Sequence, residues 1–200
     1  AWYENDGNAN PSWTAANIVT NKDGAASVIA VDIDGDGHMD IVSASVNDDT
    51  IAWYKNDGNA NPSWAAANIA ANKDGPKTVF AADIDGDGDM DIISGSAYDD
   101  TIAWHKNNGD GSSWTSANIA INADAPQSVF AADIDGDGDM DVLSASSQDN
   151  TIAWYENNGG ANPTWTKAAL DTNALSARSV FAADMDGDGD MDILSASSGD

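Results

Sequence analysis

The 200-residue sequence contains no cysteine and only two histidines. No disulfide bond can therefore cross-link the chain, and a zinc site built on cysteine and histidine is disfavoured. Basic residues are also scarce, because 7 lysines and arginines stand against 34 aspartates and glutamates, for a formal net charge of -27. A surface this acidic repels nucleic-acid phosphates and anionic membranes, so the composition indicates cations as partners and excludes nucleic acid.

Long apolar runs are missing as well. No stretch of 18 apolar residues occurs, so we expect no membrane insertion. The chain opens Ala1-Trp2-Tyr3 with neither an initiator methionine nor a signal peptide, which predicts a mature or excised chain. The 42% apolar content is enough for a substantial core, and we predict a single repeat domain over residues 1–200.

One acidic segment of nine residues occurs four times, at residues 32–40, 83–91, 133–141 and 184–192. Its pattern is Asp-X-Asp-Gly-Asp-Gly-X-Met-Asp. Four carboxylates this close together repel one another strongly unless a hard cation with oxygen ligands lies among them. Glycines at positions four and six permit the tight curl that turns the odd positions toward one centre. We therefore predict about four Ca²⁺ ions, one in each repeat.

The predicted ligands are the carboxylates at loop positions one, three, five and nine and the backbone carbonyl at position seven. Because only the main chain is used there, position seven can vary between histidine and aspartate. The full set is Asp32, Asp34, Asp36, His38 and Asp40; Asp83, Asp85, Asp87, Asp89 and Asp91; Asp133, Asp135, Asp137, Asp139 and Asp141; and Asp184, Asp186, Asp188, Asp190 and Asp192. Carboxylates with a carbonyl suit the large, flexible shell of calcium better than that of magnesium. An EF-hand is rejected, because serine replaces its glutamate at position twelve.

The acidic segments mark an internal repeat of about 50 residues, the length of a propeller blade. Each repeat contains four short runs typical of strands, separated by Gly, Asn and Asp clusters; in the second repeat we place them near residues 78–82, 92–96, 101–106 and 114–119. The pattern predicts an all-β fold, a β-propeller with four antiparallel strands per blade. A β-solenoid is disfavoured because its calcium repeats are far shorter.

The two ends of the chain each hold half a repeat. The strands near residues 180 and 194 lack two partners, and the strands near Trp2 and Trp13 are of the missing kind. The two halves pair with each other and close a ring, or they pair with other copies and give a larger ring, a dimer or an open array. The four repeats are therefore a complete propeller, or half or a segment of a larger one.

The acidic loop in its strand-loop-strand setting resembles the FG-GAP or VCBS-type repeats of integrin α-subunit propellers and of many secreted microbial and algal proteins. The resemblance covers all four repeats. It implies that the loop joins the first and second strands of a blade and that loop positions one, three, five and nine bind calcium. The sequence departs from the family in lacking a literal Phe-Gly or Gly-Ala-Pro and in having fewer repeats than the seven of integrins.

These features predict an extracellular, secreted or cell-surface, calcium-stabilised module for adhesion or recognition of a glycan or protein, without catalysis. The alternative is a structural subunit of an extracellular filament that self-associates by strand exchange between copies. A polysaccharide-active enzyme is a minor alternative, because no GxSxG elbow or cysteine nucleophile occurs and His38 and His105 lie at non-equivalent repeat positions. The eight recurring tryptophans favour packing between blades over stacking on sugars.

Overall fold

The computed structural model describes residues 1–199, which form sixteen β-strands. Three sheets are complete, with four strands each. They consist of β3 (Ala25–Val31), β4 (Asp40–Ser45), β5 (Thr50–Asn56) and β6 (Trp64–Ala71); β7 (Pro76–Ala82), β8 (Asp91–Ser96), β9 (Thr101–Asn107) and β10 (Trp114–Ala120); and β11 (Pro126–Ala132), β12 (Asp141–Ser146), β13 (Thr151–Asn157) and β14 (Trp165–Asp171). Two-stranded sheets lie at the ends, β1 (Trp2–Asn5) with β2 (Trp13–Ala16) and β15 (Ala177–Ala183) with β16 (Asp192–Ser197).

Within each sheet the strands follow chain order, and every neighbouring pair is antiparallel. In the second sheet, Phe80 is paired with Ile93, which is paired with Trp104, which is paired with Ala117. The predicted all-β class with four antiparallel strands per repeat is therefore confirmed in the three complete sheets, and the strand limits predicted for the second repeat agree to within two residues. No helix in residues 1–199 has the length and apolar character needed to cross a membrane.

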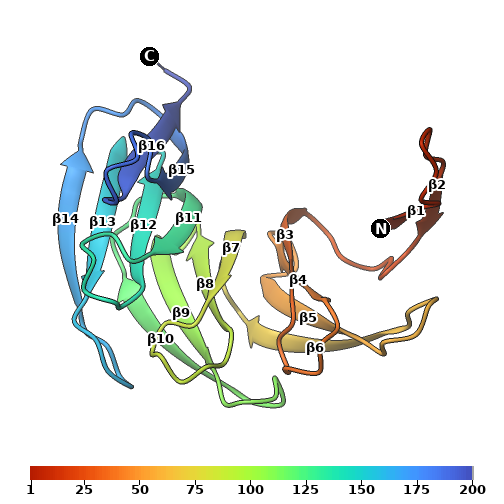
Figure 1. Cartoon of the computed structure of the whole chain (residues 1–200). Helices are drawn as coiled ribbons and strands as arrows, with labels where there is room; N and C mark the ends of the chain where they lie inside the picture. The colour runs from red at the N-terminus through yellow and green to blue at the C-terminus, as the bar shows by residue number, and fades with distance from the viewer. Residues whose placement is uncertain (200) are drawn as a thin grey trace.

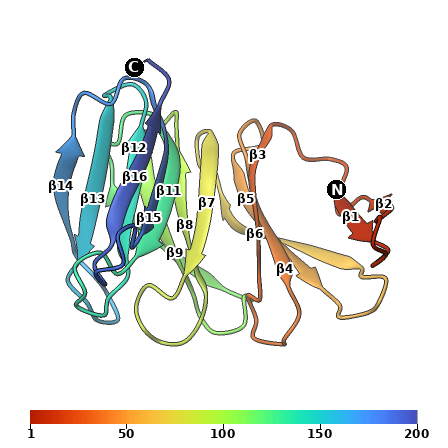
Figure 2. The same cartoon turned by 45° about the horizontal axis from the view of Figure 1, so that its top comes forward.

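The sheets stand side by side along an open arc (Figure 1, Figure 2). The first strands of successive sheets, β3, β7, β11 and β15, contact one another along its inner side, and β6, β10 and β14 lie on the outer side. One inter-sheet hydrogen bond recurs, from a valine N–H on one first strand to a hydroxyl on the preceding first strand. The pairs are Val79 with Ser27, Val129 with Thr78, and Val180 with Ser128, each at 3.3 Å.

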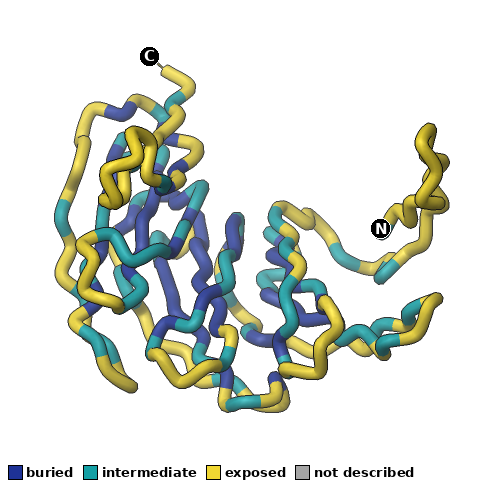
Figure 3. Tube along the Cα trace, viewed as in Figure 1, coloured by how far each residue is buried: buried dark blue, intermediate teal, exposed yellow. Residues whose placement is uncertain are grey.

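The core lies between adjacent sheets as three apolar clusters. Between the second and third sheets, for example, Ile93 and Trp104 pack with Val129 and Val142. Buried backbone accordingly follows the middle strands of the arc, and the outer strands and both ends are exposed (Figure 3). Trp53 and Trp104 are buried in these clusters, which agrees with a packing role for that tryptophan position.

The two half sheets do not close a ring in this structure. β1–β2 and β15–β16 are separate two-stranded sheets at opposite ends of the arc, and no ladder joins them in residues 1–199 (Figure 1). All four residues of β2 are exposed, and in β1 Trp2 alone is partly buried, so the first half sheet packs little against the rest of the structure. The predicted propeller is thus present only as an open row of sheets, and its closure stays a prediction.

Candidate metal sites in the acidic loops

Each acidic segment is the loop between the first and second strands of its sheet, where the family resemblance placed it. The glycines at positions four and six adopt positive φ, as in Gly86 at 71° and Gly88 at 94°. The position-one carboxylate then binds the curled backbone, because Asp83 accepts the N–H groups of Asp87 at 3.1 Å and Gly88 at 2.9 Å. The curl predicted from the glycines is confirmed, and it is held by the loop's own first aspartate.

Every loop brings three carboxylates together, with one oxygen of each within 4.8 Å of the others. Positions one and three always take part, and the third member is position five or position nine. The groups are Asp32, Asp34 and Asp36; Asp83, Asp85 and Asp91; Asp133, Asp135 and Asp137; and Asp184, Asp186 and Asp192. Hard oxygen ligands in this number fit Ca²⁺, so the residues present suit the predicted ion.

The position-seven side chains are not members of these groups. His38 instead lies against Gly58 in the turn after β5, and Asp139 lies against Gly159 in the turn after β13. This placement leaves the backbone carbonyl as the atom that position seven can offer, and its role as a ligand stays a prediction.

Position nine has a structural role that the sequence analysis missed. Asp91 is fully buried and accepts three hydrogen bonds, from Ile84 N at 3.4 Å, Trp104 Nε1 at 2.9 Å and Asn107 N at 2.7 Å. Asp40 makes the same three bonds in the first sheet. The carboxylate thus ties the loop to the third strand of its own sheet. A tryptophan 13 residues after this aspartate in the first three repeats was the available signal.

The next sheet also holds the loop. Asn107, at the end of β9, donates from Nδ2 to the carbonyl of Ile33 in the preceding acidic loop at 2.8 Å. Asn157 donates to Ile84 at 3.1 Å in the same way. Each of these asparagines therefore fixes a neighbouring loop across the gap between sheets, in addition to the loop of its own sheet.

Burial alters the electrostatics of position nine. The pKa of Asp91 is raised to about 6, chiefly by its removal from water, and the hydrogen bonds from Asn107 and Trp104 oppose this shift. Burial likewise raises the pKa of Asp141. A nearby cation would favour the charged form of such carboxylates and so offset the cost of burying them.

Position three supplies the clearest indication of a cation. The side chains of Asp34 and Asp85 are 5% and 0% exposed, and Oδ1 of each is buried without a hydrogen-bond partner. A carboxylate oxygen withdrawn from water with no donor is costly, so such atoms call for a ligand. Both atoms belong to the clustered carboxylates, where a bound cation would satisfy them.

Two lysines that are not among the predicted site residues contact the loops. Lys55 on β5 forms ion pairs with Asp34 and, at 3.3 Å, with Asp36. Lys106 on β9 pairs with Asp85 and, at 2.8 Å, with Asp87. The hydrogen bond from Lys106 lowers the pKa of Asp87, and the carboxylates in turn raise the pKa of Lys106.

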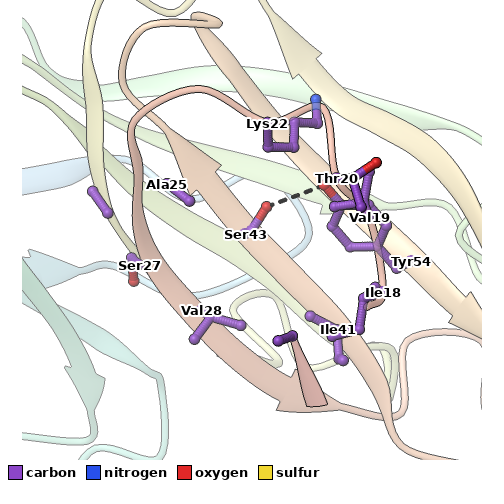
Figure 4. Close-up of a pocket in the computed structure, with 12 residues that line it drawn as sticks. Ile18, Val19, Thr20, Lys22, Ala25, Ser27, Val28, Ile41, Ser43 and Tyr54 are labelled. Carbon is purple, nitrogen blue, oxygen red and sulfur yellow. Dashed lines mark hydrogen bonds between the residues drawn. The ribbon is translucent and has the colours of Figure 1, made fainter. Parts of the chain in front are cut away.

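A pocket elsewhere in the molecule is separate from this chemistry. It lies on the first sheet, where Val28, Ile41 and Tyr54 face the chain segment that contains Ile18 (Figure 4). None of its lining residues is an acidic-loop aspartate. Ser43 and Tyr54 are joined there by a long hydrogen bond of 3.5 Å, and no charged cluster lines the pocket.

Comparison with known proteins agrees with this architecture. A family model described as an FG-GAP-like repeat matches residues 1–43, 32–94, 83–144 and 134–195. The middle matches each run from one acidic loop to just beyond the next, so they follow the repeat seen in the sheets. Comparison with curated protein sequences gives no match. Because the four matches cover nearly the whole chain, the protein belongs to the family of FG-GAP-like repeat proteins.

Proposed function

We propose that the protein is an extracellular, calcium-stabilised module for adhesion or recognition of glycans or proteins, and that it has no catalytic activity. FG-GAP repeats form β-rich modules that are typically non-enzymatic and occur in extracellular proteins. The bound ions would hold each first hairpin in shape, and the binding surface would be presented by the row of sheets. Extracellular calcium modules work with dissociation constants of about 10⁻⁴ to 10⁻³ M, a range suited to partly exposed loops.

The observation that carries the calcium proposal is the buried, unpartnered Oδ1 of Asp85. Asp85 is grouped with the carboxylates of positions one and nine, Asp83 and Asp91. A divalent ion would neutralise part of this charge and give the orphaned oxygen a partner. Because the ion binds only the curled loop, its binding free energy would add to the stability of the fold.

The test is a calcium titration of chelator-treated protein with thermal unfolding. We expect the melting temperature to rise with calcium, because an ion at 100 times its dissociation constant adds about 2.7 kcal/mol per site. Asp85→Asn should lose one site's share of this gain. Asp89→Asn, in the same loop but outside the clustered carboxylates, is the matched control and should keep it. A wild-type protein whose stability ignores calcium would contradict the proposal.

The recognition role needs its own measurement. Binding of the protein to a glycan array, with and without a chelator, would show whether calcium is needed for capture. We expect the protein to be captured by glycans in calcium and to lose this binding on chelation, because the ions order the loops of the protein. An absence of glycan capture in calcium would direct the search to protein partners or to self-association.

Self-association is the second candidate function, and exposure at the arc's ends favours it. Leu194 on β16 is 38% exposed, whereas its equivalent Leu143 on β12 is fully buried. Val28 on β3 is 68% exposed, whereas Val129 on β11 is 5% exposed. Apolar faces and an unpaired strand edge of this kind favour association with further strands.

The occupant we propose for the β16 edge is β1–β2 of a second copy. Trp2 and Asn5 occupy the repeat positions of Trp104 and Asn107, the two residues of β9 that donate to the position-nine aspartate of the second sheet. Sedimentation of the 200-residue chain should then show a mass that grows with concentration, and Trp2→Ala should reduce it. A single monomeric mass at every concentration would rule this candidate out.

A further inference from the structure

The four acidic loops are nearly identical in sequence, but the residues that face them differ. Lys55 and Lys106 precede the asparagine that ends the third strand in the first two complete sheets. Glu156 holds this position in the third. Their registers match, because Lys55 is paired with Ala65, Lys106 with Thr115 and Glu156 with Thr166 on the fourth strand. The repeat thus sets a cation beside two loops and an anion at the same place in the next sheet.

We propose that the loops are of two kinds. Those at residues 32–40 and 83–91 each carry a built-in cation, a lysine whose charge opposes calcium binding, and the loop at residues 133–141 binds calcium most tightly. This inference rests on the proposed calcium function, which it refines by ranking the sites.

The contacts of Lys106 support the built-in cation. Its ammonium group reaches two carboxylates of one loop, Asp85 and Asp87, and its side chain is 23% exposed. Asp85 keeps a second oxygen that is buried and unpartnered, so the loop retains a position for a ligand beyond the lysine. An ammonium group at hydrogen-bond distance repels an incoming divalent ion, and that repulsion lowers the affinity of the loop.

Charge in the third sheet has the opposite effect. The second loop has five aspartates and a lysine beside them, for a formal charge of -4, whereas the third has five aspartates and Glu156, for -6. Within residues 1–199, the ion pairs to loop carboxylates come from Lys55 and Lys106, and none reaches Asp135 or Asp137. The third loop therefore has the strongest internal repulsion and gains most from a divalent ion.

A site-resolved calcium titration tests the ranking. The two glycines of each loop give amide signals that report their own loop, so chelator-treated full-length chain labelled with ¹⁵N-glycine can be titrated with CaCl₂. We expect Gly136 and Gly138 to reach half of their shift at a calcium concentration at least tenfold below that of Gly86 and Gly88. Equal midpoints for all loops would overturn the inference and leave calcium binding in place, whereas no shift in any loop would overturn the calcium function itself.

Charge variants test the cause. Lys106→Gln should lower the midpoint of the second loop several-fold and leave the third unchanged, and Glu156→Lys should raise the midpoint of the third loop by a similar factor. Lys77→Gln, on the first strand of the second sheet, is the matched control because it removes the same charge away from the loop contacts. If Lys77→Gln and Lys106→Gln shift the calcium midpoint of the second loop equally, net charge is the cause and the proposed role of Lys106 as a built-in cation is wrong.

Discussion

The second and fourth acidic loops differ in sequence at one residue only, yet their last aspartates differ in burial and in hydrogen bonding. Asp91 ends the second loop fully buried, with three hydrogen bonds. Asp192 ends the fourth loop exposed, and within residues 1–199 it accepts a hydrogen bond from Met185 N alone, at 3.0 Å. The nine-residue motif thus supplies the carboxylates, but the third strand of a sheet, with its tryptophan and asparagine, determines how they are buried and held.

The largest effect should come from removing the buried carboxylate itself. Asp91→Ala leaves three hydrogen-bond donors without an acceptor. Each unsatisfied donor costs about 1–3 kcal/mol, so we expect the free energy of unfolding to fall by about 4 kcal/mol. Asp192→Ala should cost less than about 1 kcal/mol, because water already reaches this residue. Urea unfolding in chelator measures both changes without any contribution from metal.

Equal losses in the two aspartate variants would contradict this prediction, because burial would then have no bearing on the role of position nine. If Asp91→Ala does not fold, Asp91→Asn keeps one oxygen acceptor and should give a smaller loss that is still larger than that of Asp192→Asn.

The apolar residues on the strands that follow these loops differ in the same way. Leu143 and Leu194 are equivalent, with exposed fractions of 0% and 38%. Leu143→Ala should lower the free energy of unfolding by about 3 kcal/mol, because it removes buried surface and leaves a cavity. Leu194→Ala should cost about 1 kcal/mol or less. Chemical denaturation measures both, and a loss from Leu194→Ala as large as that from Leu143→Ala would indicate that the end sheet is covered in solution.

A smaller effect, on the pH dependence of stability, is expected from the second sheet and not from the other two complete sheets. His105 is fully buried between Ser94 and Ser116, and burial with the nearby charge of Lys73 lowers its pKa to about 3. The unfolded chain takes up a proton below pH 6.5, and the folded chain does not do so until about pH 3. Stability is therefore lost as pH falls through this window, by about 1.4 kcal/mol per pH unit, or about 2 kcal/mol at pH 5.

The control for this pH effect is present in the repeat. Tyr54 and Tyr155 fill the equivalent positions and contact the equivalent serines, so a tyrosine at position 105 should fit. Urea midpoints at pH 7 and pH 5 should differ less for His105→Tyr than for wild type, because the aspartates contribute equally to both proteins. The same pH dependence in both would show that His105 is not the group responsible.

Much of the local structure followed from the sequence. Strands near residues 92–96 and 101–106 were predicted from β-branched and aromatic runs bounded by turn residues, and the structure has them at Asp91–Ser96 and Thr101–Asn107. Gly86 and Gly88 take the positive φ that the curled loop needs. These features depend on neighbours in the chain, which a sequence displays directly.

The contacts between strands were harder to predict from the sequence. The bond from Trp104 to Asp91 and the ion pair from Lys106 to Asp87 join residues on different strands, and their geometry depends on register. A repeat shows that such residues recur at fixed spacing, but not which face of the sheet they share. The bond from Asn107 to Ile33 crosses between sheets and depends on how the sheets are stacked.

The four repeats, the all-β class, the strands and the clustering of aspartates in four loops follow from the order of amino acids, because they depend on periodicity and on local backbone chemistry. Which carboxylates are buried, which loops contact a lysine, and whether the row of sheets is open depend instead on the folded arrangement. Burial and charge pairing are set by the sheet that lies alongside. Identical loops therefore differ wherever their neighbours differ.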